Sequence, residues 1–339
     1  MVEKLYVAGA GSWLPERMSL GDAVAQGLVE RALVWNTGIE SVCVSTGMAP
    51  PEMAVRAART AIGASDHEPD EFALVLHACA YHQGHDMWSP ASYIQRFALG
   101  NVCPAMEVRQ MSNGGLAAVE LAAAYLTAHH GTAALVTTAD RFSLPGFDRW
   151  RTDPATICGD GASAIVLSRR RGFALIRSLV TVSDPGLERG GRGDRQFGDA
   201  PLSAGTPIDM TANSGALVKE IGLEALLRRL EAGQWEAFDR ACTAAGLKFS
   251  DIDRYVLPNL GRTRMKAQFF EPFGIDPART TWDWGRTVGH LGAGDALAGF
   301  AELTSAGMLA PGQTCLLAGL GAGFSWTVAI LEITADVRG

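Results

Sequence analysis

The sequence Cys-Gly-Asp-Gly-Ala-Ser-Ala-Ile-Val-Leu, at residues 158–167, places a glycine turn directly before an apolar, β-branched run. Near the end of the chain, Gly-Leu-Gly-Ala-Gly-Phe-Ser-Trp-Thr-Val-Ala-Ile-Leu at residues 319–331 has the same pattern. An alanine-rich helical segment precedes each stretch, at 116–127 and at 297–308. Two copies of one α/β unit, divided near residue 170, would explain these repeats. Turns of glycine and alanine between buried strands are common, however, and this simpler explanation stays open.

Outside these two stretches, short apolar runs alternate with alanine-rich helical segments, which is the pattern of layered α/β proteins. Strands are predicted at residues 5–8, 72–77, 133–138, 162–168, 174–182, 254–258, 314–318 and 326–333. Helices are predicted at residues 51–62, 91–98, 115–128, 215–245, 264–273 and 296–306. The segment 183–215 is rich in Gly, Asp, Arg and Pro, and we expect a long surface loop or a cap over a site.

The composition is that of a folded protein that does not specialise in nucleic acids. The 339 residues are 47% hydrophobic and 19% charged, which allows a sizeable core and excludes wholesale disorder. With 29 Lys and Arg against 36 Asp and Glu, the formal net charge is −7, so a dedicated nucleic-acid binder is disfavoured. The arginine run at 169–171 is expected to be a solvated turn rather than a binding patch.

The cysteines and the apolar runs indicate a soluble cytoplasmic protein with no membrane partner. The six cysteines lie at least 24 residues apart and lack zinc-ligand spacing, so we expect buried thiols in a reducing compartment. The charged N-terminus has no signal-peptide core, and no apolar run is long enough to span a bilayer.

A first candidate for chemistry is the segment Met-Ser-Asn-Gly-Gly at 111–115, which opens the helix predicted at 115–128. Ser112 would lie in the positive field of unsatisfied backbone amides, where a nucleophile and an oxyanion are stabilised. Serine and asparagine are also favoured helix N-caps, so a purely structural role is the alternative. The sequence has no G-x-S-x-G motif and therefore does not support an α/β-hydrolase nucleophile elbow.

A second candidate is a glycine-rich corner that holds one of the seven histidines. His290 lies there with Asp295 five residues later, so a carboxylate could orient an imidazole next to a serine. A loop histidine followed by an N-capping aspartate is the structural alternative. His82 and His85, with Asp86, look like metal ligands but lack a convincing third ligand. We therefore predict no metal and no cofactor.

A third candidate is the turn Gly-Leu-Gly-Ala-Gly at 319–323. Its glycines allow a ligand to approach the backbone closely and expose amide donors. It lacks the Gly-Lys-Ser/Thr of a phosphate-binding loop, and a strand rather than a helix follows it. The functional alternative is that the turn supplies a backbone oxyanion donor.

Four segments together point to one family: Gly-Ala-Gly-Ser-Trp-Leu-Pro-Glu-Arg (9–17), Thr-Gly-Ile (37–39), Gly-Asp-Gly-Ala (159–162) and Gly-Ala-Gly-Phe-Ser-Trp (321–326). With these, the chain resembles the ketoacyl-acyl carrier protein synthase III family nearly from end to end. The resemblance implies the thiolase fold, a duplicated α/β unit with five α-β-α-β-α layers, in a homodimer. It implies an N-terminal half, 1–170, with the nucleophile, and a C-terminal half, 171–339, with the His/Asp pair and the oxyanion turn.

Several residues depart from the family pattern. The family's nucleophilic cysteine falls on Ser112, while its active-site histidine falls on Pro258 and its asparagine on Arg286. His290 and Asp295 instead resemble a subgroup from natural-product pathways, whose members are acyltransferases or unusual starter-unit selectors. The tryptophan and arginine with which ordinary members hold coenzyme A are not recognisable, which leaves open whether the donor is an acyl carrier protein or acyl-CoA.

The departures imply a consistent mechanism. A serine hydroxyl needs an adjacent base, and His290 oriented by Asp295 would supply it. The backbone amides of Ser112 and Ala322 would hold the oxyanion, and such donors are worth roughly 3–4 kcal/mol each in related chemistry. The acyl-serine could then pass its acyl group to a hydroxyl or an amine.

Three functions are therefore considered. The first is an acyltransferase that moves a short alkyl or aryl group from a carrier-protein or coenzyme A thioester to a small-molecule acceptor, as in polyketide or antibiotic biosynthesis. The second is a starter-unit condensing enzyme that uses malonyl-carrier protein. The third is a non-catalytic partner of such enzymes, which the Ser–His–Asp set disfavours.

Residues around the proposed site are assigned by their place in the sequence. Candidate walls of the substrate pocket are Met111, Trp88, Phe147, Trp150 and Arg286. A candidate docking surface for an acidic carrier protein is formed by Arg262, Arg264 and Lys266, for which a solvated helix face is the alternative. The apolar loop at 82–88 is expected to cross the interface of the homodimer.

Overall fold

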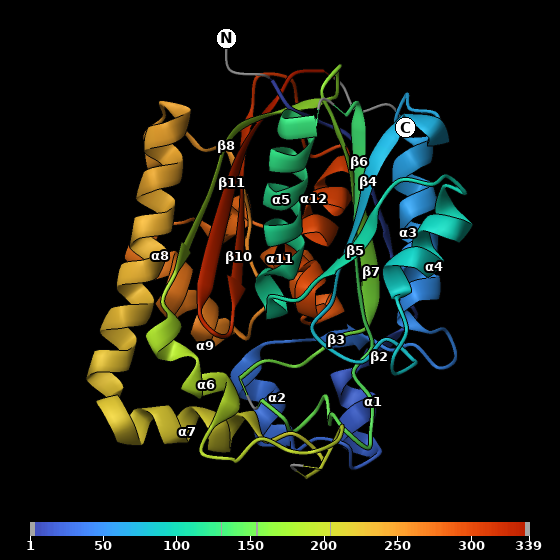
Figure 1. The fold of residues 1–339 in the computed structure, drawn as a ribbon. Helices are drawn as coiled ribbons and strands as arrows, with labels where there is room; N and C mark the ends of the chain where they lie inside the picture. The colour runs from blue at the N-terminus through green and yellow to red at the C-terminus, as the bar shows by residue number, and fades with distance from the viewer. Residues whose placement is uncertain (1–3, 130, 154, 204, 336–339) are drawn as a thin grey trace.

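The computed structural model of the chain describes residues 4–129, 131–153, 155–203 and 205–335. The elements form five layers in the order helix, strand, helix, strand, helix, from left to right in Figure 1. The central layer holds α5 (Gly114–His129) and α12 (Asp295–Ser305). The outer layers hold α8 (Leu223–Ala245) on one side, and α3 (Pro50–Gly63) and α4 (Pro90–Ala98) on the other. The predicted α-β-α-β-α architecture is confirmed.

Within the described residues, nine strands form one continuous hydrogen-bonded sheet in the order β5-β4-β6-β7-β1-β8-β11-β10-β9. The bounds of these strands are β1 (Tyr6–Trp13), β4 (Phe72–Ala78), β5 (Ala105–Val108), β6 (Ala133–Asp140), β7 (Gly161–Ser168), β8 (Ala174–Ser183), β9 (Arg254–Val256), β10 (Thr314–Gly321) and β11 (Ser325–Ile333). The strands before residue 170 thus lie on one side and the later ones on the other. The division into two duplicated halves stays a prediction.

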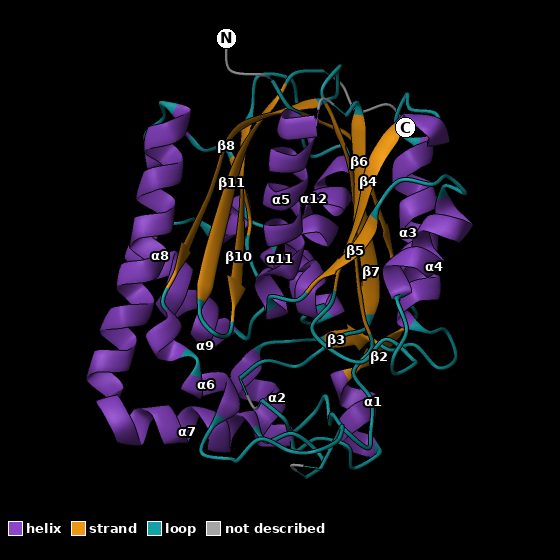
Figure 2. Cartoon of the chain, viewed as in Figure 1, coloured by secondary structure: helices purple, strands orange, loops and turns teal. Residues whose placement is uncertain are grey.

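The two sides of the sheet are joined by a narrow contact. β1 pairs with β8 through only two residue pairs, Tyr6 with Leu175 and Val7 with Ala174. The two groups of strands therefore face each other across α5 and α12, as Figure 2 shows. Both helices are rich in small and apolar residues, and nearly all of α12 and the first turns of α5 are buried, as expected of helices enclosed between sheets.

The packing of α3 on β1 depends on small residues in both elements. Alanines at 54, 57, 58 and 61 on α3 are fully buried, and contacts with β1 and β7 run along the helix. A side chain at Gly9 of β1 would place its Cβ against the carbonyl oxygen of Ala61. Because both groups belong to regular backbone, neither can move away without breaking an element.

We therefore expect Gly9→Ala to lower the free energy of unfolding by about 3 kcal/mol, through overpacking. The matched control is Gly63→Ala, at the exposed end of α3, where no atom lies within 4 Å of an added Cβ. That change should be neutral or slightly stabilising, because alanine is the better helix former. Urea unfolding of both variants measures the difference. Equal stabilities would contradict the close contact between β1 and α3.

All eight predicted strands are present, with ends within a few residues of those expected. The helix expected at 215–245 is wrong as one element: Gly222, with φ +82°, separates α7 (Met210–Ile221) from α8. The helix expected at 264–273 begins earlier, as α9 (Arg262–Met265), and continues through a π-helical turn (Lys266–Phe270) into α10 (Glu271–Phe273). The expected loop at 183–215 contains one short helix, α6 (Arg189–Arg192), before α7 begins.

The remaining elements are short. They are β2 (Arg17–Ser19), β3 (Ser41–Cys43), α1 (Leu20–Ala25), α2 (Arg31–Thr37) and α11 (Trp282–Val288). Of the six cysteines, Cys103 is half-buried and the others are buried, as predicted. No helix in the described part of the chain combines the length and the apolar character needed to cross a membrane.

Candidate active site

The candidate nucleophile lies in a tight turn that leads directly into α5. Ser112 is the middle residue of the 3₁₀ turn η2 (Met111–Asn113), and α5 begins at Gly114. Met111 has φ +49°, which is unusual for a residue other than glycine. A Cβ at Gly115 would lie 2.5 Å from the carbonyl oxygen of Ala293. The glycine thus lets the start of α5 approach the glycine-rich corner that the sequence predicted to be functional.

Ser112, His290 and Asp295 form a continuous hydrogen-bonded chain. Ser112 Oγ lies 2.8 Å from His290 Nε2, and His290 Nδ1 lies 2.5 Å from Asp295 Oδ2. The carboxylate accepts a hydrogen bond from Nδ1–H and so keeps the proton of the neutral ring on Nδ1. Nε2 is therefore free to accept the hydroxyl proton of Ser112. The backbone amide of Leu291 donates to Asp295 Oδ1 at 2.7 Å and holds the carboxylate in place. The structure therefore brings together the three residues that the sequence proposed.

The backbone of His290 is fixed on both sides. Its amide donates to the carbonyl of Ile157 at 3.0 Å, and its own carbonyl accepts from Gly159 at 2.9 Å. The segment 157–159 is in turn held by Arg149, which donates to the carbonyl of Cys158 and forms a buried ion pair with Asp160 at 2.8 Å. The glycine turn within residues 158–167 therefore fixes the backbone of His290 and, with it, the position of the imidazole.

The surroundings of His290 change its protonation. Burial lowers the pKa of His290, but the charge and hydrogen bond of Asp295, with the charges of Asp153 and Asp140, together raise it more, so the net pKa lies above its usual value. A protonated imidazole cannot accept the hydroxyl proton of Ser112. The base is therefore active only at pH values above this raised pKa.

We expect the rate of Ser112 acylation to rise with pH through the pKa of His290, and then to level off. The sign follows because the neutral imidazole is the reactive form. Stopped-flow or quenched acylation from about pH 5 to about pH 9 measures the profile. The control His290→Ala should lack this rise, and a wild-type rate that falls over the same range would contradict a neutral base.

The end of β10 lies against the nucleophile turn. A Cβ at Gly321 would meet the carbonyl oxygen of Gln110 and lie 2.8 Å from Asn113 Cβ. Asn113 Nδ2 also donates to Thr327 Oγ1 of β11 at 2.8 Å. Ala322 directly follows this contact, so its turn borders the turn of Ser112. The role of the Ala322 amide as an oxyanion donor stays a prediction.

One buried residue that contacts the hydrogen-bonded Ser112–His290–Asp295 series was not predicted from the sequence. The backbone amide of Asn259 donates to Asp295 Oδ2 at 2.8 Å, and its side-chain Nδ2 donates to the carbonyl of Gly289 at 3.0 Å. The resemblance had placed the family's histidine at Pro258, whereas the adjacent residue makes these contacts. The available signal was a polar residue, Asn259, three positions after the end of a short strand.

Arg286 was predicted to be a wall of the pocket and to replace the family's asparagine, and this role stays a prediction. Its Nη2 pairs with Glu40 at 2.6 Å and its Nη1 lies 4.0 Å from Asp283, and both carboxylates are more than half exposed. The guanidinium thus points to surface acids. The side chain that reaches Ser112 is His290, four residues later.

The other pocket candidates lie in different surroundings. Met111 is part of the nucleophile turn, and Trp150 is buried in the hydrophobic core. Phe147 packs against Phe142, with ring centroids 4.8 Å apart, in a cluster that includes a tyrosine. Trp88 is 38% exposed, beyond the end of β4. Met111 thus adjoins Ser112, and the roles of the other three residues as pocket walls stay predictions.

The three candidate docking residues do not share one face. Arg264 is half-buried and donates to Asp153 and Thr156, each at 2.7 Å. Arg262 and Lys266 are exposed, one helical turn apart. A docking surface can therefore use these two cations, while Arg264 holds α9 to the loop before β7.

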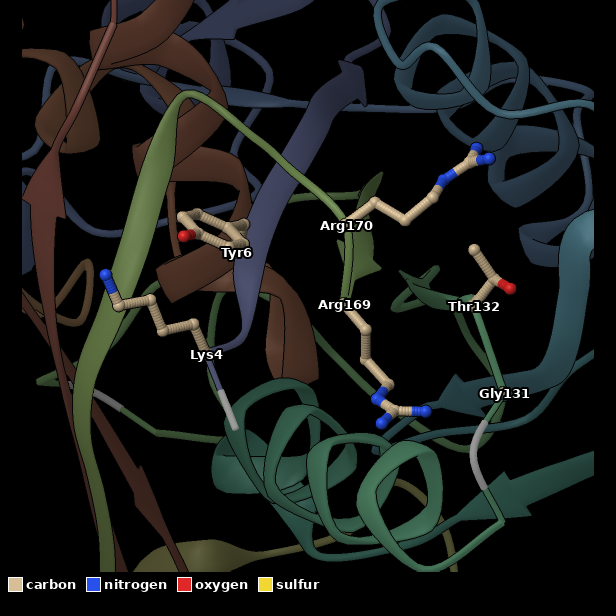
Figure 3. Close-up of a pocket in the computed structure, with 6 residues that line it drawn as sticks. All are labelled: Lys4, Tyr6, Gly131, Thr132, Arg169 and Arg170. Atoms are coloured by element: carbon tan, nitrogen blue, oxygen red, sulfur yellow. The ribbon is translucent and has the colours of Figure 1, made fainter. Parts of the chain in front are cut away.

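A hollow of about 450 Å³ lies at the other end of the molecule, where the arginine run meets β1 (Figure 3). Gly131, in its lining, comes just after the last residue of α5, whereas Ser112 precedes the first. The side chains of Arg169 and Arg170 point in different directions, and Arg170 pairs with Glu71 at 2.5 Å. The hollow is thus separate from the Ser112 site and does not present convergent cations.

No group of three or more His, Cys, Asp and Glu side chains in the described ranges is placed to hold a metal ion. His82 Nδ1 lies 3.9 Å from Asp86 Oδ1, with both side chains more than half exposed.

Comparison with known proteins matches both halves of the chain. The family "3-Oxoacyl-[acyl-carrier-protein (ACP)] synthase III" matches residues 106–185, and its "C terminal" counterpart matches residues 242–333. The β-ketoacyl-[acyl-carrier-protein] synthase III of Rhodospirillum rubrum is 27% identical over 96% of this chain and 98% of its own.

Solved structures agree with this assignment. ChlB3, described as an acyltransferase, has a TM-score of 0.93 and 32% identity over 98% of this chain and 99% of its own. The 3-oxoacyl-(acyl carrier protein) synthase III of Pseudomonas aeruginosa shares the fold, with a TM-score of 0.77 and 21% identity over 99% of this chain and 100% of its own.

The chain therefore belongs to the 3-oxoacyl-[acyl-carrier-protein] synthase III family and has the thiolase fold. Members of this family are enzymes that catalyse acyl transfer or condensation, so the general class of activity follows. The family and the fold implied by the sequence are confirmed, whereas the serine-dependent subgroup stays a proposal.

Proposed function

We propose that this protein transfers an acyl group from a thioester to a hydroxyl or amine of a small natural product, through an acyl-Ser112 intermediate. The observation that carries the proposal is the chain from Ser112 Oγ through His290 to Asp295, with contacts of 2.8 and 2.5 Å. A serine without such a base would be a poor nucleophile at neutral pH.

In the first step, Ser112 Oγ attacks the thioester carbonyl while His290 Nε2 accepts its proton. The amides of Ser112 and Ala322 stabilise the oxyanion, and Asp295 stabilises the imidazolium. The thiolate then leaves and takes the proton from His290. In the second step, His290 removes the proton of the acceptor hydroxyl or amine as that group attacks the acyl ester. The bond between the acyl carbon and Ser112 Oγ then breaks, and Ser112 takes the proton back from His290.

The relatives support this choice of reaction and donor. ChlB3, at 32% identity, is described as an acyltransferase, which favours transfer. The names of the matching families contain acyl carrier protein, which favours a carrier-bound thioester, although acyl-CoA offers the same reactive group. The acyl group is proposed to be a short alkyl or aryl group, as in polyketide and antibiotic biosynthesis.

Condensation with a malonyl thioester is the second candidate, because relatives such as the Rhodospirillum rubrum protein bear the name of a ketoacyl synthase. That reaction needs donors that polarise the malonyl carbonyl as carbanion character develops. The Asn259 side-chain amide donates to the carbonyl of Gly289, and Arg286 pairs with Glu40, so both side chains are engaged by other groups of the protein. Transfer to oxygen or nitrogen is therefore favoured.

The deciding experiment supplies one acyl-carrier protein donor either with a panel of alcohols and amines or with malonyl-carrier protein. Ester or amide products without carbon dioxide release support transfer. β-Ketoacyl product, formed as fast as the donor is consumed, would establish condensation instead. A protein that neither hydrolyses nor transfers the donor would be the non-catalytic partner.

Carrier-protein docking is proposed to use Arg262 and Lys266. We expect the double change Arg262→Glu and Lys266→Glu to raise the KM for a carrier-bound donor about tenfold, with little effect on kcat. Added salt should weaken wild-type binding in the same direction. The control is Arg240→Glu on α8, whose side chain is 55% exposed. An unchanged KM would indicate that Arg262 and Lys266 form only a solvated face.

A homodimer is also proposed, with β5 at the edge of the sheet as the contact. Large apolar side chains near this edge are unusually exposed, and Met87 and Val102 are fully so. An uncovered strand edge with apolar neighbours is a liability that a second copy would remove. The loop at 82–88 belongs to the same exposed region.

A further inference from the structure

Asp140, the last residue of β6, connects two segments around the candidate site. Its buried carboxylate accepts hydrogen bonds from Ala80 at 2.9 Å and Tyr81 at 2.8 Å, both just beyond β4. It also accepts from the amide of Ala293 at 3.0 Å, in the turn between His290 and Asp295. One carboxylate therefore holds the catalytic turn against the end of the sheet.

The contact with this turn is sterically tight. Gly292 has φ +61°, and a Cβ added there would overlap the carboxylate of Asp140. The turn thus rests directly on the carboxylate, and His290 lies three residues before the amide that Asp140 binds. A displacement of Asp140 would be transmitted to the imidazole through a very short piece of backbone.

Asp140 also has no cationic partner apart from the imidazole. In the described residues, no Lys or Arg forms an ion pair with it. Burial raises the pKa of Asp140 to about 6, although the amides it binds and the nearby His290 lower it in part. Its negative charge in turn contributes to the raised pKa of His290.

We propose that Asp140 is a positioning residue for the acyl transfer: it fixes the turn that carries His290 and supplies a second negative charge that stabilises the imidazolium. The inference rests on the proposed function, because in that reaction the imidazolium forms as Ser112 passes its proton to His290. Asp140 is thus a second carboxylate, in addition to Asp295, that acts on His290. It does so through the backbone of the turn and through its negative charge.

The other titratable groups around the imidazole differ from Asp140 in their contacts or in their charge. Asp295 binds Nδ1 directly, and Asp153 adds a further negative charge while it pairs with Arg264. Burial raises the pKa of Cys79, beside Asp140, to about 12, and that of Cys158 well above its usual value, so both thiols stay neutral.

The test uses a p-nitrophenyl phosphonate ester, because the natural acyl group is not needed for it. Ser112 Oγ forms a bond to phosphorus, p-nitrophenolate leaves, and the hydroxyl proton passes to His290. Asp140→Asn should lower the plateau rate about tenfold and shift the pH midpoint downward by roughly 0.5–1 unit, because the imidazolium loses a neighbouring charge. The matched control is Asp253→Asn: this carboxylate accepts from Thr314 at 2.8 Å, at the far end of β10. It should change neither value.

A double-mutant cycle separates this role from a general structural one. In a His290→Ala background, Asp140→Asn should change the rate less than about twofold, because Asp140 acts through the imidazole. Gly292→Ala keeps the charge but disturbs the contact, so it should lower the rate and leave the midpoint in place. This variant also tests the proposal if Asp140→Asn does not fold.

The inference would be overturned if folded Asp140→Asn kept the wild-type pH midpoint. It would also be overturned if Asp140→Asn lowered the rate tenfold in the His290→Ala background, or if Gly292→Ala reacted at the wild-type rate. These outcomes differ from failure of the proposed function. In that case the wild-type protein itself would not be modified at Ser112, as peptide mass spectrometry would show.

Discussion

Ser112→Ala is expected to leave no acyl-enzyme adduct after incubation with an acyl thioester, whereas the wild-type protein gains the mass of the acyl group. The reason is that Ser112 Oγ is the atom that lies 2.8 Å from His290 Nε2, at the start of α5. Removing it leaves the base without a nucleophile to activate. Intact-mass and peptide spectrometry measure the adduct and its position.

The buried cysteines provide an internal control. Burial raises the pKa of Cys43 to about 11 and that of Cys79 to about 12, so their thiols stay protonated and react poorly. An adduct on either, or one that survives Ser112→Ala, would remove Ser112 from the mechanism. Ser112→Cys should retain acylation, because a thiolate needs less help from a base.

The fold could be predicted from the sequence because its buried strands are continuous apolar runs. β4, β6 and β7 are almost fully buried, and such runs are visible without any partner. β2 and β3 have three residues each and exist through pairing with each other, so no local pattern marks them. The break at Gly222 was missed because helical sequence continues on both sides of this single glycine.

The candidate site could be predicted where local sequence carries the signal, and not elsewhere. His290 and Asp295 stand five residues apart in one corner, so their pairing was proposed from spacing alone. Asp140 reaches Ala293 across 153 positions, and Asn259 reaches Asp295 across 36. Such contacts exist only once the chain has folded. Arg286 was assigned from a short Gly-x-Thr likeness, and its contact with Glu40, 246 positions away, could not be read from that segment.

His290→Ala is expected to lower the rate of acylation by roughly 10³-fold, since the serine then has no base within reach. The Asp295→Asn change should cost less, about 10- to 100-fold, if the carboxylate orients the imidazole and stabilises its charge. Leu291 and Asn259 donate to different oxygens of Asp295, at 2.7 and 2.8 Å, and the single oxygen of an asparagine can still accept from one of these amides. The turn itself should therefore be retained.

The double change His290→Ala and Asp295→Asn decides whether these residues act as one unit. If Asp295 works only through the imidazole, the double variant should be barely slower than His290→Ala alone, because groups that cooperate show non-additive losses. Independent roles would instead multiply the two losses, giving a rate far below that of either single variant. Single-turnover acylation with the same donor measures all four rates, and thermal unfolding of each variant checks that the fold is intact.

A His290→Ala protein with nearly wild-type acylation would exclude the imidazole as the base. The short contact between His290 Nδ1 and Asp295, both buried, makes the non-additive outcome the expected one, because the carboxylate has no route to Ser112 other than through the ring.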